Sequence, residues 1–219
     1  MNINREKDEK SSEMLDNILI RKNSLISTSC VKKIFRDKEV FVFGAGPSLV
    51  SGIEKYRNFF RNKIKISADG ATSALIERGI YPNLVVSDLD GRISDQIKAN
   101  KNKSIMVIHS HGDNISKVKK YTHKFQGSIL GTTQVDPKKY RCLYNFGGFT
   151  DGDRAVYLSA HFKPKKIFLI GFDFNKEVGR YSFVKESKKD VEFKLKKLDW
   201  CKKLIRILEE KSKVNIEKI

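Results

Sequence analysis

The sequence has little cysteine and no long apolar run. Three cysteines occur in 219 residues, at positions 30, 142 and 201, and none forms a C-x-x-C pair. An odd number of widely separated cysteines suits neither a disulfide framework nor a zinc site, and indicates small buried hydrophobes instead. No apolar run reaches the roughly 18 residues that a bilayer requires, and the first ten residues are polar and charged. We therefore expect a cytoplasmic protein that does not bind membranes.

Internal repeats and low-complexity linkers are also lacking. A hydrophobic share of 39% and a charged share of 32% are typical of a folded globular protein. At 219 residues the chain is long enough for one domain with a substantial core. We expect an N-terminal helical extension over residues 1–36 and one domain over residues 37–219. The apolar residues of the extension are spaced as in amphipathic helices, which indicates a structural role.

The chain has no excess of acidic residues, because its formal net charge is +18. Such a charge can indicate nucleic acid, an anionic membrane or an anionic small substrate. The excess is spread along the chain: residues 185–219 carry twelve Lys and Arg against seven Asp and Glu. That mixture is typical of a helix surface rather than a basic arm. Charge alone therefore does not favour a nucleic-acid partner.

Short apolar runs alternate with helical patterns from Val40 to Gly171. The expected strands cover residues 40–43, 64–68, 84–87, 104–108, 128–130, 141–146 and 166–170. This alternation predicts a Rossmann-like α/β fold: a doubly wound, mostly parallel sheet of six or seven strands with helices on both faces. Apolar residues at three- and four-residue spacing then predict a long amphipathic helix over residues 187–211. Its Trp200 is expected in the core or at an interface.

A glycine-rich turn follows the first expected strand. Gly44, Gly46, Pro47 and Ser48 stand where that strand passes into a helix. Such a turn lets backbone N–H groups approach a phosphate, and the helix N-terminus adds about half a positive charge. The motif lacks the third glycine of the dinucleotide fingerprint and the Lys-Ser/Thr ending of a Walker A loop. A tight turn without a ligand is the alternative interpretation.

Acidic residues follow the second and third expected strands. Asp69 precedes Gly70 and Ala71, and Asp88 and Asp90 stand one residue apart before Gly91. Because ligands of open α/β sheets bind beyond the carboxyl ends of the strands, these acids should face one crevice. Two carboxylates at this spacing predict a site for a divalent cation or for phosphate chemistry. Alternatively, Asp69 and Asp88 cap helices, which leaves Asp90 without a structural role.

Polar loops follow the later strands. The sequence H-S-H-G-D-N contains His109, His111, Asp113 and Asn114. A zinc site is disfavoured, because histidines two apart on a strand point to opposite faces and no further soft ligand lies nearby. We expect His109 or His111, with Asp113, to line the crevice. In the alternative interpretation, Asp113 or Asn114 caps the helix that follows.

The loop from Phe149 to Ala155 carries a second group of charges. Thr150 or Asp151 is a good helix N-cap, but a cap does not explain Asp151, Asp153 and Arg154 together. Asp173 follows the last expected strand. It either faces the crevice or turns the chain.

Taken as a set, these loops resemble a known family. A-D-G-A (68–71), Y-P-N-L-V-V-S-D-L-D-G (81–91) and F-T-D-G-D-R-A (149–155) are similar to the catalytic domain of thiamine pyrophosphokinases. F-G-A-G-P-S-L (43–49), H-S-H-G-D-N (109–114), G-T-T-Q (131–134) and G-F-D-F (171–174) add a more specific resemblance. Together the motifs look like the archaeal-type 6-hydroxymethyl-7,8-dihydropterin pyrophosphokinases, the MptE-like group. The resemblance covers residues 40–173 and the lysine-rich last helix.

The resemblance implies transfer of a diphosphate group from ATP, with Mg²⁺, to the hydroxymethyl group of a reduced pterin. ATP and the pterin are then the partners, and a homodimer is compatible with this interpretation. The implied metal ligands are Asp88 and Asp90, completed by Asp113 or Asp151. The implied nucleotide contacts come from the glycine-rich turn and from Asp69, Gly70 and Ala71. Arg154 would neutralise phosphoryl charge, and Asp151 and Asp113 are both candidates for the general base. The substrate contacts would come from His111, Asn114, Thr132, Thr133, Gln134 and Asp173.

Two alternatives compete with this prediction. The first is a pyrophosphokinase for thiamine or another small alcohol; thiamine pyrophosphokinases carry a β-rich domain after the catalytic one, whereas this chain is expected to end in a helix. The second is a non-catalytic module of the same fold that binds a nucleotide or nucleic acid. It requires basic residues gathered into one stripe.

Overall fold

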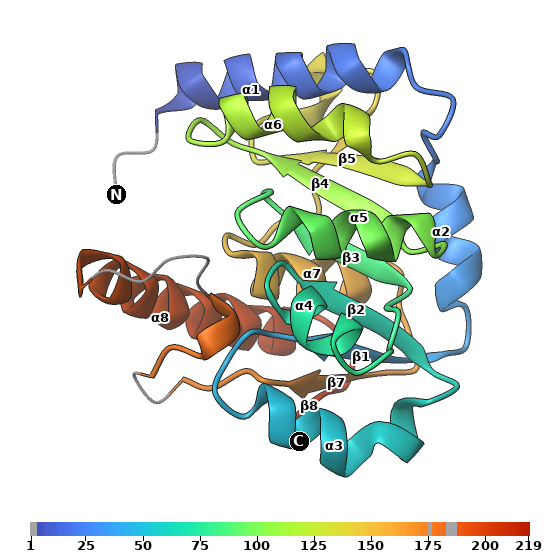
Figure 1. The fold of residues 1–219 in the computed structure, drawn as a ribbon, viewed down its shortest axis with the longest axis vertical. Helices are drawn as coiled ribbons and strands as arrows, with labels where there is room; N and C mark the ends of the chain where they lie inside the picture. The colour runs from blue at the N-terminus through green and yellow to red at the C-terminus, as the bar shows by residue number, and fades with distance from the viewer. Residues whose placement is uncertain (1–3, 175–176, 183–187) are drawn as a thin grey trace.

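The protein is built around one sheet of eight parallel strands, seen here in a computed structural model that describes residues 4–174, 177–182 and 188–219 (Figure 1). Their spatial order is β6-β5-β4-β3-β2-β1-β7-β8, and every pair of neighbours is parallel. The strands are β1 (Glu39–Phe43), β2 (Ile64–Ala68), β3 (Leu84–Ser87), β4 (Ile105–Ser110), β5 (Ile129–Thr133), β6 (Leu143–Tyr144), β7 (Lys166–Ile170) and β8 (Ile216–Lys218). The predicted fold class is confirmed, and the sheet has one strand more than predicted.

Helices cover both faces of the sheet, because successive side chains of a strand point to opposite faces. Val40 and Val42 join a core with α2, α7 and α8, whereas Phe41 and Phe43 join a core with α3 and α4. A third core lies under α1, α5 and α6. The helices are α1 (Arg5–Ile20), α2 (Thr28–Phe35), α3 (Leu49–Phe60), α4 (Ala71–Ile76), α5 (Ile93–Lys101), α6 (Ile115–Tyr121), α7 (Asp151–His161) and α8 (Lys188–Lys211).

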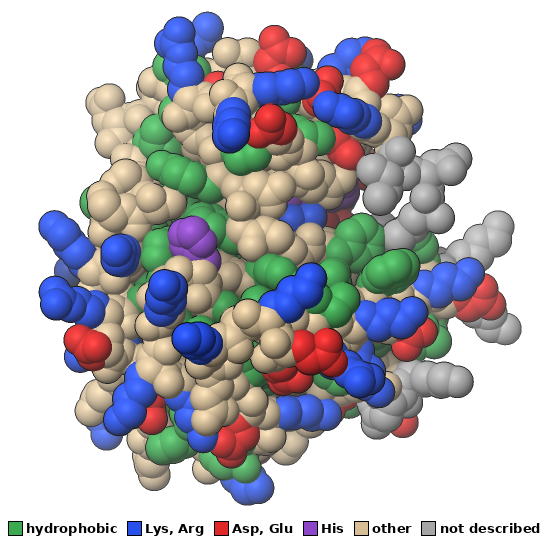
Figure 2. Space-filling view, turned by 180° about the vertical axis from the view of Figure 1, so that it is seen from behind, with side chains coloured by type: hydrophobic (Ala, Val, Ile, Leu, Met, Phe, Trp, Pro, Cys, Tyr) green, Lys and Arg blue, Asp and Glu red, His purple; other side chains and the backbone are tan. Residues whose placement is uncertain are grey.

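Basic side chains are distributed over the face shown in Figure 2 rather than gathered into one patch. On this face Lys and Arg are interspersed with acidic, polar and apolar side chains. This face therefore presents no continuous basic stripe of the kind that binds nucleic acid. Among the described residues, no helix combines the length and the apolarity that crossing a membrane demands.

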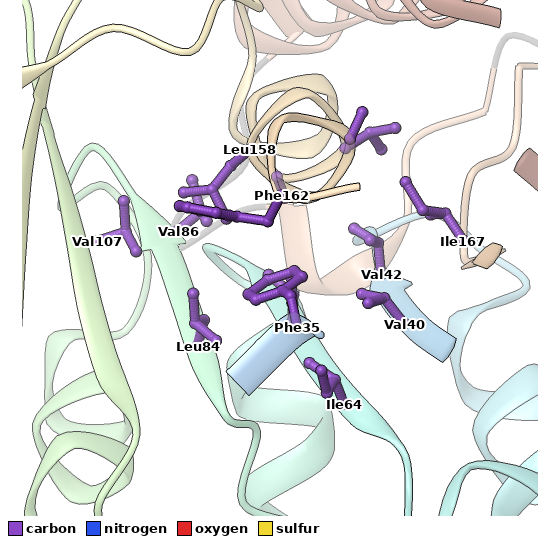
Figure 3. Packing of buried hydrophobic residues seen from close by; sticks show 14 of the residues in the cluster. Phe35, Val40, Val42, Ile64, Leu84, Val86, Val107, Leu158, Phe162 and Ile167 are labelled. Atoms are coloured by element: carbon purple, nitrogen blue, oxygen red, sulfur yellow. The ribbon is translucent and has the colours of Figure 1, made fainter. Parts of the chain in front are cut away.

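The N-terminal helices are part of the main core. Phe35 of α2 packs among Val40, Ile64 and Leu84, opposite Phe162 at the end of α7 (Figure 3). The rings of Phe35 and Phe162 have centroids 5.1 Å apart. Helix α1 lies beside α6, and its Leu15 and Leu19 are fully buried (Figure 1). Helices α1 and α2 thus share the core of the sheet, although the expected division at residue 36 itself stays a prediction.

The strand order reverses between β1 and β7, and the two loops that follow these strands are bound to each other. The amide of Gly44 donates to the carbonyl of Ile170 at 2.8 Å, and that of Gly46 to the carbonyl of Gly171 at 2.9 Å. A Cβ atom on Gly46 would collide with the Gly171 carbonyl and with the Asp173 carboxylate. Glycine is therefore required there by close approach.

The C-terminal end differs from the prediction in two respects. Helix α8 is followed by β8, which extends the sheet by pairing Ile216 with Ile167 of β7. A strand of three residues is too short to show an alternating pattern in the sequence. Trp200 is 51% exposed, so its expected place in the core is wrong and the interface interpretation stays a prediction.

Candidate active site

Four neighbouring strands are each followed by a polar residue. The first residues after β2, β3, β4 and β5 are Asp69, Asp88, His111 and Gln134. Because these strands are parallel neighbours, all four residues lie along one edge of the sheet, with about 4.8 Å between successive strands. The expected crevice beyond the strand ends thus has a defined order of side chains.

Three carboxylates meet at one end of this row. Asp69, Asp88 and Asp151 each offer an oxygen atom, and these atoms lie within 4.8 Å of one another. We call these three residues the acid group. Asp151 reaches it from the first turn of α7, which crosses the sheet beneath β1, β2 and β3. Carboxylate oxygens are the ligands that Mg²⁺ prefers, so the donor set of the acid group fits that ion.

Asp69 is held in place by three hydrogen bonds to the same oxygen. Its Oδ1 accepts from Ser87 Oγ at 2.6 Å, and from Gly91 N and Gln96 Nε2 at 2.9 Å each. All the donors to this carboxylate among the described residues bind Oδ1. The other oxygen atom, Oδ2, can therefore bind a cation. The N-cap residue of α4 is Gly70, without a side-chain cap, so the capping alternative for Asp69 is wrong. Its backbone φ of 38° is in the left-handed region.

Asp88 is oriented by the loop after β4. His111 lies with Nε2 3.3 Å from Asp88 Oδ2. The amide of Asp113 donates to Nδ1 of the same ring at 3.3 Å, which puts the ring proton on Nε2, where it is donated to Asp88. Burial alone would raise the pKa of Asp88, but the hydrogen bond from His111 and the charges of Lys197 and Lys117 lower it.

Two acids proposed as metal ligands lie outside the acid group. Asp90 is exposed and forms an ion pair with Lys117. Asp113 is also exposed. Helix α5 begins after Arg92, so Asp88 does not cap it either. The structure thus pairs Asp88 with Asp69 rather than with Asp90, and a role for Asp90 or Asp113 in cation binding stays a prediction.

The two aspartates of α7, Asp151 and Asp153, have different functions. Thr150 is the N-cap and forms a capping box with Asp153, whose Oδ1 accepts from the Thr150 amide at 2.6 Å. Asp153 is therefore structural, whereas Asp151 is left for the acid group. Burial, together with the charges of Asp88 and Asp69, raises the pKa of Asp151 well above its ordinary value. The same two causes, burial and the charge of Asp88, raise the pKa of Asp69.

Helix α8 brings positive charge to the acid group. Lys194 and Lys197 are half-buried and one turn apart. Burial lowers the pKa of Lys194, and the charges of the three acids oppose that shift. Lys197 acts electrostatically on Asp88 and Asp151. Sequence reasoning missed both lysines, although a signal existed for Lys194, which stands three residues after Val191 and four before Leu198, on the apolar face of the helix.

Several expected substrate contacts are occupied inside the protein. Asn114 is buried and donates to the carbonyls of Asp88 and His109 at 2.8 and 2.7 Å. Thr133 bonds Ser12 of α1 at 2.6 Å, and Thr132 donates to the carbonyl of Ile108 at 3.1 Å. Asn114 stands at the N-cap of α6 without a side-chain cap bond, so the capping alternative is wrong for it. These residues connect loops, and their contact with substrate stays a prediction.

The glycine-rich turn is likewise bound to the protein. Besides the amides of Gly44 and Gly46, the Ser48 amide and hydroxyl both donate to Asp173 Oδ2 at 2.8 Å. Pro47 has no amide hydrogen. A Cβ atom on Gly70 would collide with the carbonyl of Tyr181. The nucleotide contacts predicted for this turn stay a prediction, and three of its amides already have partners.

A pocket of about 540 Å³ lies at the other end of the row, beyond β5. It is lined by Gln134, a predicted substrate contact, by Arg154, predicted to neutralise phosphoryl charge, and by Asp8 from α1. Asp8 was missed, although a signal existed. It stands 7 and 11 residues before Leu15 and Leu19, which places it on the same buried face of the helix. The remaining lining residues are Arg5, Val135, Asp136, Pro137, Asn145, Gly148 and Phe149.

The family model and three named relatives of this chain give the same result. The family model described as 6-hydroxymethylpterin diphosphokinase MptE-like matches residues 13–179. Three archaeal relatives carry the name 6-hydroxymethyl-7,8-dihydropterin pyrophosphokinase. The protein of Methanocaldococcus jannaschii is 41% identical over 98% of this chain and 92% of its own length. The protein of Pyrococcus furiosus is 42% identical over 96% of this chain and 89% of its own length. The protein of Methanothermobacter thermautotrophicus is 40% identical over 98% of this chain and 91% of its own length. Among solved structures, the MAf glycosyltransferase of Magnetospirillum magneticum AMB-1 aligns with a TM-score of 0.48 and 15% identity, over 79% of this chain and 28% of that chain.

Proposed function

The chain belongs to the MptE-like family of 6-hydroxymethylpterin diphosphokinases, and from this premise we propose how its crevice acts. The protein transfers the diphosphate group of ATP to the hydroxymethyl group of 6-hydroxymethyl-7,8-dihydropterin. The observation that carries the proposal is the convergence of Asp69, Asp88 and Asp151 from β2, β3 and α7. Phosphoryl transfer depends mainly on positioning and charge neutralisation, and these three carboxylates supply the cation site that it needs.

The acid group binds the cation, and the lysines of α8 bind phosphate. Asp69, Asp88 and Asp151 hold Mg²⁺, which neutralises charge on the triphosphate when bound. Lys194 and Lys197 face the same place and bind phosphate oxygens beside the cation. A lysine is suited to this, because its ammonium group acts as a compact charge with three donors.

In the transfer step, the hydroxymethyl oxygen attacks the β-phosphorus of ATP. The new oxygen–phosphorus bond forms as the bond between the β-phosphorus and the bridging oxygen of AMP breaks. The hydroxyl proton goes to Asp151, whose carboxylate lies in the acid group and has a second oxygen that can accept it. Asp113, the other candidate base, is exposed and lies outside the acid group.

The competing functions have less support. The three relatives are named for the pterin, and none is named for thiamine. A nucleic-acid module is opposed by acids at the strand ends and by the dispersed basic side chains in Figure 2. The proposal therefore keeps the pterin as the acceptor.

Release of AMP tests the proposal directly. Wild-type protein, ATP and Mg²⁺ are incubated with the pterin or with thiamine, and AMP and the diphosphate product are measured. We expect turnover of the pterin, and its loss in Asp88→Asn with an unchanged fold. Asp37→Asn is the matched control, because Asp37 is exposed before β1, at the opposite ends of the strands. Turnover of thiamine alone would contradict the acceptor, and full activity of Asp88→Asn would contradict the cation site.

A further inference from the structure

The pocket beside β5 contains a chain of hydrogen bonds that begins in the N-terminal helix. Asp8 Oδ1 accepts from the Gly112 amide at 2.6 Å, and Asp8 Oδ2 accepts from Gln134 Nε2 at 2.8 Å. The other end of the Gln134 amide, Oε1, accepts from Arg154 Nη2 at 3.1 Å. Asp8, Gln134 and Arg154 therefore form one row in the wall of the pocket, with a carboxylate at one end and a guanidinium at the other.

Both ends of this row have hydrogen-bonding capacity left. Asp8 is 4% exposed and Arg154 is 7% exposed. Within the described part of the chain, neither forms an ion pair at 4.0 Å or less. A carboxylate can accept about four hydrogen bonds and a guanidinium can donate five, whereas Asp8 accepts two and Arg154 donates two, the second to the carbonyl of Phe149. Buried charges with unfilled capacity are costly, which points to a polar ligand in the pocket.

We propose that this pocket binds the aminopyrimidine ring of the pterin, and that Asp8 determines specificity for it. This inference rests on the proposed function, because it assigns the acceptor of that reaction to a place. The 2-amino group and N3–H of a pterin are adjacent donors, and O4 beside them is an acceptor. The two ends of the row, acceptors on Asp8 and donors on Arg154, have the complementary order. Val135, Pro137 and Phe149 supply apolar surface for the rings.

The position of the pocket suits the reaction. Gln134 follows β5 and Asp88 follows β3, two strands away, so their strand ends are about 10 Å apart. A two-ring heterocycle held at β5 by its pyrimidine edge can direct the hydroxymethyl group on its other ring toward the acid group. Arg154 lines the pocket and interacts electrostatically with Asp151 and Asp88, so it lies between the two places.

Direct binding measures the contribution of Asp8. The affinity of 6-hydroxymethyl-7,8-dihydropterin is measured by calorimetry, without ATP or Mg²⁺, for wild type, Asp8→Asn and Asp16→Asn. Asp16 is the matched control: it is also buried on α1, but it accepts from the Arg141 and Cys142 amides outside the pocket. We expect Asp8→Asn to weaken pterin binding about tenfold to hundredfold, and Asp16→Asn to leave it unchanged. The KM for ATP should not change in either variant.

A substrate analogue separates recognition from a merely structural effect. In the 2-oxo analogue an acceptor replaces the 2-amino donor, so it faces the Asp8 carboxylate unfavourably. Wild type should bind the 2-amino pterin at least about tenfold more tightly than the analogue, and Asp8→Asn, which can donate to the 2-oxo group, should reduce or reverse that ratio. Equal affinity of wild type for both compounds, or the same ratio in Asp8→Asn, would overturn the inference. Absence of pterin turnover by wild type would instead contradict the proposed function itself.

Discussion

His111 Nε2 lies 3.3 Å from Asp88 Oδ2, so the residue that follows β4 donates to the residue that follows β3. This contact lowers the pKa of Asp88 against the effect of burial. It also fixes the direction of a carboxylate that the proposed function places on Mg²⁺. Partners of metal ligands act in this way in general, and their loss typically weakens metal binding 10- to 100-fold.

Replacement of His111 should therefore weaken Mg²⁺ binding. His111→Ala removes the donor to Asp88, and we expect about a tenfold higher Mg²⁺ requirement for AMP release. His111→Gln keeps an N–H donor at a similar reach and should recover part of the loss. His123→Ala, which changes an exposed histidine after α6, is the control. Equal Mg²⁺ dependence in all four proteins would show that the contact does not support the cation site.

Asp151 should lower the free energy of unfolding of the metal-free protein at neutral pH. Its pKa is raised by burial and by the charges of Asp88 and Asp69, so the native state holds its proton more tightly than the unfolded chain does. Its contribution to stability is thus fully present below the unfolded pKa of about 3.9, and it is lost as pH rises through the native pKa. At pH 7, Asp151→Asn should raise the free energy of unfolding by about 1 kcal/mol, or Tm by about 2–4 °C.

Thermal unfolding across pH checks this prediction. The difference in Tm between wild type and Asp151→Asn, without metal, should grow as pH rises above about 4 and vanish below it. Added Mg²⁺ should stabilise wild type and have little effect on the variant, which also loses turnover. A variant less stable than wild type at neutral pH would argue against mutual repulsion in the acid group.

The lysines of α8 give a prediction about the transfer step. Lys197 faces Asp88 and Asp151, whereas its neighbour Lys196 is exposed on the same helix. Because charge accumulates on phosphate oxygens in the transition state, Lys197→Ala should reduce kcat about tenfold to hundredfold. Lys196→Ala should retain wild-type kcat. Steady-state AMP release at saturating ATP measures both, and equal rates would remove α8 from the mechanism.

For Asp90, the sequence and the structure predict different effects of substitution. The short spacing of Asp88 and Asp90 predicts that either Asn substitution abolishes turnover. The structure instead pairs Asp90 with Lys117 at the surface. We therefore expect Asp88→Asn to lose far more activity than Asp90→Asn. Equal losses in AMP release would restore the predicted Asp88–Asp90 pair as the cation site.

Most strands and their polar ends could be predicted from the sequence. The predicted bounds of β2, β3 and β7 agree with the structure. β3 and β7 consist mainly of a continuous apolar run, as buried parallel strands do, and a glycine or a polar residue marks where each of them ends. The residue after each strand is then expected at the same edge of the sheet. This reasoning identified Asp69 and Asp88 as crevice residues.

The residues that make up the acid group were harder to predict from the sequence. Asp69 and Asp88 come together because β2 and β3 are neighbours, and Asp151 joins them only because α7 crosses beneath those strands. The choice of Asp151 over Asp153 depends on which of them enters the capping box with Thr150. The position of Asp8 was harder still: the apolar spacing places it on the buried face of α1, but no local pattern shows that this face packs beside β5.

Asn114 tests the assignment of a scaffolding function to a predicted substrate contact. Its Nδ2 donates to the carbonyls of Asp88 and His109, and its Oδ1 accepts from the His111 amide at 3.0 Å and from Ser11 Oγ at 3.1 Å. Because the side chain is 1% exposed, Asn114→Ala would leave several buried polar groups unpaired. We expect the free energy of unfolding to fall by about 2–3 kcal/mol.

Denaturant unfolding and kinetics together distinguish the two functions of Asn114. Asn102→Ala is the control, because Asn102 is exposed and its side chain donates to a single carbonyl, that of Lys98. A scaffolding residue should lose stability, and its loss should lower kcat through displacement of Asp88 and His111. A direct substrate contact should instead raise the KM for the pterin at unchanged stability. Because the side chain has four partners on three elements of the crevice, we expect the first outcome.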